Sequence, residues 1–156
     1  MSIYLDNAAT SYPKPENVYK AMDHYLRHIG ASAGRGAYRR ALEADSLVYK
    51  TRRLLGRLFN VKDVTRIIFT SNVTESLNLA LKGFLREGNH VVTTHMEHNA
   101  VWRPLKVLER ERRIQITVLP SPGGMAPDPD RLEQSIRPET RLVIMNHASN
   151  VTGTLM

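Results

Sequence analysis

The feature that most constrains the fold is a regular alternation of short apolar segments and amphipathic helices in the later part of the chain. The apolar segments predict strands at residues 66–70, 90–94, 114–119 and 142–146. Helical periodicity lies between them, at residues 74–86, 100–113 and 130–136. Strands that alternate with helices are typical of an α/β fold with a mostly parallel sheet and flanking helices. We expect that architecture over residues 61–156.

The first 60 residues carry no strand pattern and predict an N-terminal arm followed by helices. Residues 6–15 are too rich in turn formers to be regular structure. Helices are predicted from Pro15 to about Ile29 and from Tyr38 to Phe59, with a glycine-rich loop between them at residues 30–36. We therefore expect a single segment, 1–156, in which residues 1–60 lead into the α/β part.

Composition excludes several classes of protein. Hydrophobic residues make up 42% and charged residues 24% of the chain, a balance typical of globular proteins. No apolar run approaches the roughly 20 residues that cross a bilayer, and the opening residues show no secretory signal pattern. The chain has no cysteine, so disulfides and thiolate zinc sites are excluded within it. We expect a cytoplasmic protein that does not bind a membrane.

The basic balance of the chain raises the question of nucleic acid. The formal net charge is +7, but the arginines are spread over several helical segments and aromatic residues are not interleaved with them. This pattern favours a solvated basic surface, with an acidic partner as the alternative. We expect no nucleic-acid partner.

Ligands of open α/β sheets bind at the carboxyl ends of the strands, so the loops that follow the strands are candidate sites. The first such loop, residues 70–76, has serine and threonine hydroxyls at a helix start, where free N–H groups can hold a phosphate. The alternative is an ordinary capped helix, because Asn72 and Glu75 have capping-box spacing. The loop lacks the glycines and lysine of a nucleoside-triphosphate loop.

The two later loops, residues 94–100 and 146–154, are also polar. His95, Glu97 and His98, together with His147, could be metal ligands, but their spacing falls on a turn, and we expect no metal. Either histidine of the earlier loop could instead stack on a flat ring, act as an acid or base, or belong to a polar turn. Asn150 could donate a hydrogen bond at the sheet edge or only stabilise a turn.

Five stretches in order carry a family resemblance: Tyr4–Thr10, Gly34–Tyr38, Phe69–Ser76, Met96–Asn99 and His147–Gly153. In these the sequence resembles the cysteine desulfurase branch of the class V aminotransferases, which have the type I fold of pyridoxal-phosphate enzymes. The resemblance spans essentially the whole chain. It implies that residues 61–156 form the first part of the large, cofactor-binding domain, with an incomplete sheet.

The resemblance also implies roles for individual residues. Val73 and Thr74 would bind the phosphate of pyridoxal 5′-phosphate, through a backbone N–H and a hydroxyl respectively. His98 would stack on the pyridine ring and relay protons, and Asn150 would bond the ring hydroxyl and help to orient the substrate. Further residues would line the substrate side or approach a partner subunit's site: Asn7, Ala8, Ala9 and Arg35.

By the same resemblance the reaction would convert L-cysteine to L-alanine and leave a persulfide, in a homodimer that passes sulfur to an acceptor protein. The family's Schiff-base lysine lies beyond the asparagine matched by Asn150, and no lysine of this chain has that context. The strands beside residues 66–70 would also come from later chain, so we expect rearrangement, association with another chain, or completion by further chain. Alternatives are a selenocysteine lyase, another class V aminotransferase or lyase, or a non-catalytic fragment that pairs with another subunit.

Overall fold

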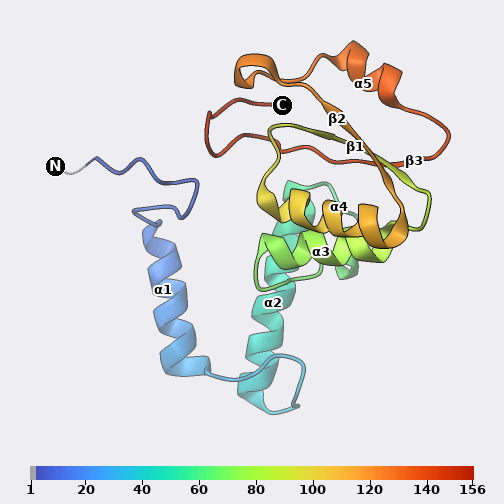
Figure 1. Cartoon of the computed structure of the whole chain (residues 1–156). Coiled ribbons are helices and arrows are strands. Elements are labelled where there is room, and N and C mark those ends of the chain that lie inside the picture. The colour runs from blue at the N-terminus through green and yellow to red at the C-terminus, as the bar shows by residue number, and fades with distance from the viewer. Residues whose placement is uncertain (1–2) are drawn as a thin grey trace. The chain divides into compact units, whose positions relative to one another are not determined.

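The computed structural model describes residues 3–156 and contains two compact units, one ending at Phe69 and the other running from Thr70 to Met156 (Figure 1). None of the helices within residues 3–156 is both long enough and apolar enough to cross a membrane. The two units are described separately.

The first unit is helical, as the sequence predicts. After a polar arm, α1 (Glu16–His24) continues directly into the π-helix η1 (Tyr25–Ile29), which ends at the left-handed residue Gly30. A loop then leads to the long helix α2 (Arg39–Leu58). A small core joins η1 to α2, and its members are Tyr25, Ile29, Ala31 and Ala44.

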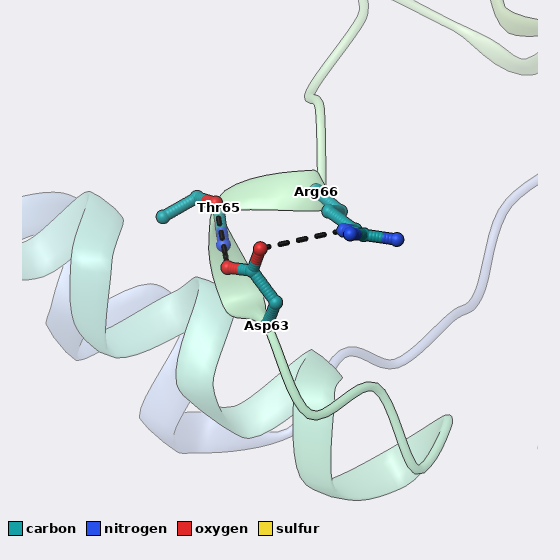
Figure 2. Close-up of polar contacts among 3 residues, drawn as sticks. All are labelled: Asp63, Thr65 and Arg66. Atoms are coloured by element: carbon teal, nitrogen blue, oxygen red, sulfur yellow. Dashed lines mark hydrogen bonds and ion pairs between the residues drawn. The ribbon is translucent and has the colours of Figure 1, made fainter.

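The end of α2 packs against the 3₁₀-helix η2 (Val64–Arg66) at a glycine that allows close approach. A Cβ atom at Gly56 would lie 2.8 Å from Cγ1 of Val64 and 3.2 Å from the carbonyl oxygen of Val61. Figure 2 shows the cap of η2, in which the Asp63 carboxylate accepts bonds from the Thr65 hydroxyl at 2.6 Å, the Thr65 N–H at 3.1 Å and Arg66 Nε at 3.3 Å. The Thr65 bonds, with a smaller effect from Arg66, hold the pKa of the exposed Asp63 carboxyl below its usual value.

The predicted strand at residues 66–70 is wrong. Arg66 belongs to η2, and residues 67–70 pair with no other strand in the part of the chain that the structure describes. The carbonyl oxygen of Ile67 instead accepts a bond of 3.0 Å from Arg52 Nε. Because a strand needs a neighbouring strand to complete its hydrogen bonds, the apolar pattern alone is not sufficient here.

The second unit contains a parallel sheet of three strands in the order β2-β1-β3: β1 is His90–Thr94, β2 is Gln115–Leu119 and β3 is Thr140–Val143. The predicted strands at 90–94 and 114–119 are confirmed with small boundary changes. The last strand begins two residues before its predicted start at 142 and ends three residues before its predicted end at 146. All five residues of the central β1 are buried.

The helices α3 (Val73–Phe84) and α4 (Asn99–Arg112) lie side by side on one face of this sheet, and α5 (Pro129–Ser135) lies on its other side (Figure 1). The 3₁₀-helix η3 (Pro122–Gly124) precedes α5. One apolar cluster fills the space between the sheet, α3 and α4. Its buried members are Leu81, Leu85, Val91, Val101, Leu105, Leu108 and Ile114. This packing holds the carboxyl end of β1 beside the start of α4.

Candidate functional site

The loop before α3 is a capped helix start, which confirms the capping interpretation of the sequence. The Oδ1 atom of Asn72 accepts the N–H of Glu75 at 2.9 Å. The carboxylate of Glu75 turns back and accepts the N–H of Ser71 at 2.8 Å. These two bonds fix the first turn of α3 but do not use the N–H groups of its first two residues.

Those donors belong to Val73 and Thr74, the two residues predicted to bind a phosphate. In residues 3–156 neither backbone N–H has a hydrogen-bond acceptor, and the Thr74 hydroxyl has no partner either. Both side chains are exposed. The N–H groups of a first helical turn, at the positive end of the helix dipole, are a suitable binding site for an anion. The geometry is therefore compatible with a bound phosphate.

The loop after β1 places His98 at the N-cap of α4. Its Nδ1 atom accepts the N–H of Ala100 at 3.0 Å. A neutral imidazole has one protonated nitrogen, so this bond requires the proton to be on Nε2. The exposed ring therefore has a fixed orientation, and its Nε2 has no hydrogen-bond partner among residues 3–156.

The loop after β3 forms a small hairpin that carries Asn150 at its tip. An antiparallel bridge pairs Ala148 with Leu155, and the buried Ser149 hydroxyl accepts the N–H groups of Val151 and Thr152, each at 3.2 Å. Asn150 itself is exposed. The turn is organised by Ser149, and the Asn150 side chain makes no hydrogen bond with any residue that the structure describes.

Two neighbouring pockets at these loops share His98. One, of about 290 Å³, is lined by Thr74 and His98 together with the basic side chains of Lys82 and Arg103. The other, of about 500 Å³, is lined by residues 95–99 and by the hairpin residues 149–152, including Asn150. The three predicted loops thus contribute to two pockets within the second unit, and both pockets are lined by His98 and Asn99.

The sequence predicted no role for the carboxylate of Glu97 other than that of a possible metal ligand. It accepts the backbone N–H of Asn146 at 2.7 Å and the hydroxyl of Thr94 at 3.3 Å. Burial raises the pKa of Glu97 above its usual value, and the bonds from Asn146 and Thr94 and the nearby His98 only partly oppose this. No cluster of three His, Cys, Asp or Glu side chains suited to a metal occurs among residues 3–156.

The other predicted site residues lie in the first unit, where the structure shows their local surroundings. Oδ1 of Asn7 accepts the N–H of Tyr12 at 3.0 Å, and the N–H of Ala9 donates to the carbonyl oxygen of Asp6 at 3.1 Å, so Ala8 lies within a turn. The loop that carries Arg35 is held by a bond of 2.6 Å from the Gly34 N–H to Asp45. Their substrate contacts remain predictions.

A parallel α/β sheet with a phosphate-compatible helix start and a fixed histidine near its carboxyl edge is typical of the ligand-binding edge of α/β proteins, a class that includes cofactor-dependent enzymes. Comparison with known proteins identifies the family. Residues 3–156 match the family described as aminotransferase class-V. The chain belongs to this pyridoxal-phosphate-dependent family.

Individual relatives agree with that assignment. A probable cysteine desulfurase of Methanothermobacter thermautotrophicus is 35% identical over 154 residues, which are 98% of this chain and 38% of that protein. The apo structure of a cysteine desulfurase from Thermococcus onnurineus NA1 is 30% identical with a TM-score of 0.83, covering 95% of this chain and 37% of that one. SspA in complex with cysteine is 28% identical with a TM-score of 0.84, covering 99% and 44% respectively. The chain thus spans about two fifths of the length of these relatives.

Proposed function

We propose that this chain supplies part of the pyridoxal 5′-phosphate site of a cysteine desulfurase, which releases sulfur from L-cysteine as an enzyme-bound persulfide and leaves L-alanine. The main support is that Thr74, at the start of α3, and His98 and Asn150, in the loops after β1 and β3, line two pockets that share His98 and Asn99. The names of the relatives, and the cysteine bound to SspA, support the choice of substrate.

The residues present fit the phosphate group of the cofactor. Two N–H groups and one hydroxyl at Val73 and Thr74 have no acceptor within residues 3–156, and Lys82 and Arg103 add positive charge to the same pocket. Phosphate binding at a helix start needs N–H donors and the positive end of the helix dipole, and α3 offers both. These donors would hold the phosphate and so fix one end of the cofactor.

His98 and Asn150 would orient the rest of the cofactor. The bond from Ala100 holds Nδ1 of His98 as an acceptor, so Nε2 carries the transferable proton and the ring keeps one orientation. Asn150, at the tip of the hairpin, would donate its side-chain N–H to the ring hydroxyl. Pyridoxal phosphate, when bound, supplies the electron sink that the reaction requires.

The proposal for the whole protein extends beyond these residues. Asn7, Ala8, Ala9 and Arg35 would border the substrate in a homodimer, or in a complex with another chain, and a sulfur-acceptor protein would receive the product. We propose that this protein is cytoplasmic. The family resemblance supports these statements. They can be tested by mixing this chain with a full-length relative or a partner chain and measuring whether a complex forms.

Cofactor binding to this chain alone is the first test. Trp102, the single tryptophan, lies in α4 one turn after His98, so its fluorescence can report titration with pyridoxal phosphate. We expect saturable binding that Thr74→Ala and His98→Ala each weaken about tenfold, the effect of losing one good interaction. His147→Ala is the matched control, because His147 lines neither pocket.

Equal affinities for the wild type and the Thr74 and His98 variants would contradict the proposed site. Borohydride reduction and peptide mapping add a second readout. A single lysine adduct whose formation depends on Thr74 would reveal a covalent attachment point that the family resemblance does not imply. Scattered adducts on several lysines would indicate nonspecific reaction with the aldehyde.

A further inference from the structure

The hydrogen-bond ladder between β1 and β3 is extended by a side chain at the carboxyl edge of the sheet. The N–H of Ile144 donates to the carbonyl oxygen of Val92 at 3.0 Å, as a neighbouring strand residue would. Two residues later, the N–H of Asn146 donates to the carboxylate of Glu97 at 2.7 Å. Donors of one strand toward one neighbour recur at every second residue, so the carboxylate stands in for the next strand carbonyl.

Glu97 is also tied to the end of β1. The fully buried Thr94 donates its hydroxyl to the same Glu97 oxygen at 3.3 Å and accepts the N–H of Met96 at 3.1 Å. A separate bond of 3.0 Å runs from the Asn146 side chain to the carbonyl oxygen of Met96. The loop after β1 is thus joined to the end of β3 by two independent bonds.

Placing the Glu97 carboxylate at this half-buried position costs free energy. A half-buried carboxylate loses hydration, and burial raises the pKa of Glu97 despite the donors around it. The carboxylate joins the two loops whose side chains are proposed to contact the cofactor ring. His98 is the next residue in the chain, and Asn150 follows Asn146 by four residues in the loop after β3. Glu97, His98 and Asn150 all line one pocket of about 500 Å³.

We propose that Glu97 is a positioning residue that holds the loop carrying His98 against the loop carrying Asn150. Its carboxylate accepts the N–H of Asn146 and so fixes where the second loop leaves the sheet. The purpose of this arrangement rests on the proposed function, because these are the two side chains that would orient the cofactor. The arrangement itself can be tested without cofactor.

The test compares Glu97→Ala and Glu97→Gln in the full chain, with Glu87→Ala as the control. Glu87 lies in the exposed turn before β1, in the same unit and away from the pocket. In NMR hydrogen exchange we expect the Asn146 amide to exchange about tenfold faster in Glu97→Ala, because its acceptor is lost. Glutamine keeps an acceptor oxygen, so Glu97→Gln should retain most of the protection.

Two further readouts separate positioning from a general loss of structure. The His98 ring and the Asn150 side-chain amide should both change chemical shift in Glu97→Ala, while the amides in the middle of α4 keep wild-type exchange rates. The dissociation constant for pyridoxal phosphate should rise about tenfold in Glu97→Ala and less than about threefold in Glu97→Gln, as expected for one lost interaction. Glu87→Ala should match the wild type in each measurement.

Unchanged exchange at Asn146, or unchanged His98 and Asn150 shifts when Asn146 exchanges faster, would overturn the proposal. Wild-type affinity for pyridoxal phosphate in a Glu97→Ala chain whose loops have moved would also overturn it. If the wild type binds no pyridoxal phosphate, the proposed cofactor site is wrong in this chain. The exchange and shift comparisons would then still decide whether Glu97 positions the two loops.

Discussion

The Nδ1 atom of His98 accepts the N–H of Ala100 at 3.0 Å, so the imidazole that lines both pockets is also the N-cap of α4. One side chain therefore has a structural and a proposed functional role, and substitutions can separate them. An asparagine at this position would keep a capping oxygen, whereas an alanine would remove the cap.

We predict that His98→Ala lowers the free energy of unfolding by about 1 kcal/mol, the usual effect of a lost N-cap. His98→Asn should restore most of that stability because its side-chain oxygen can accept the same N–H. Both variants should bind pyridoxal phosphate more weakly than the wild type, since neither has an imidazole. Urea unfolding and fluorescence titration measure the two quantities. A His98→Asn chain with wild-type affinity would show that the ring acts only as a cap.

A second prediction concerns pH and His90, which is fully buried at the start of β1. Its two ring nitrogens each lie 2.8 Å from a hydroxyl oxygen, Nδ1 from that of Thr140 and Nε2 from that of Thr117. Burial, and to a lesser extent Arg137, lower the pKa of His90 below its usual value, while Glu139 opposes the shift. Between the lowered pKa of folded His90 and the usual value of about 6.5, the unfolded chain therefore binds more protons than the folded chain.

The contribution of His90 to stability should be complete above a pH of about 6.5 and should decrease as the pH falls from there through the lowered pKa. His90→Gln should be less stable than the wild type at pH 7.5 and should lose less further stability between pH 6.5 and 5.5. Urea unfolding at several pH values tests this, with the exposed His147→Gln as the control. Parallel curves for the wild type and His90→Gln would contradict the linkage.

A third prediction contrasts two helical glycines. Gly56→Ala should destabilise the first unit by about 1 to 3 kcal/mol, because its Cβ would lie 2.8 Å from Val64 and 3.2 Å from a backbone oxygen. A Cβ at Gly83 would have no heavy atom within 4 Å. Gly83→Ala should therefore stabilise α3 by about 0.5 to 1 kcal/mol, because alanine favours the helix more than glycine does. Thermal unfolding followed by circular dichroism measures both. A stabilising Gly56→Ala would show that α2 and η2 are less closely packed than described.

A fourth prediction concerns the cap of η2 in Figure 2. Thr65→Val removes the hydroxyl bond, the largest cause of the lowered pKa of Asp63, and leaves the backbone bond. The pKa of Asp63 should therefore rise toward its usual value in Thr65→Val. It should rise less in Arg66→Gln, because Arg66 has the smaller effect. Carboxyl-carbon NMR titration measures the pKa, and equal values in Thr65→Val and the wild type would contradict the described cap.

Much of the fold is local in origin and follows from the sequence. The apolar periodicity of α3 and α4 and the alternation around β1 and β2 depend on residues within one or two turns of each other. The cap formed by Asn72 and Glu75 was predicted from their spacing, and the structure confirms that Asn72 caps α3. The N–H groups of Val73 and Thr74 have no acceptor within α3, because they lie in the first turn of the helix.

The sequence did not predict the features that depend on distant partners. The sequence of residues 66–70 is that of a strand, but a strand requires a neighbour, and Arg52 bonds Ile67 instead. β3 ends at Val143, before its apolar run does, and beyond it the Ile144 N–H still bonds β1 while the Asn146 N–H bonds the distant Glu97 side chain. Glu97 and Asn146 are 49 residues apart, and only the parallel pairing of β1 and β3 brings them within 2.7 Å.

The sequence by itself determined the helices, the strands β1 and β2, their order and the polar loops that follow, because those properties depend on neighbouring residues. It did not determine that residues 66–70 form no strand. The tertiary structure decided which segments pair, and it brought Thr74, His98 and Asn150 to two pockets that share His98 and Asn99. The physical reason is that strand pairing and helix packing satisfy backbone bonds and bury apolar surface through contacts between residues far apart in the chain.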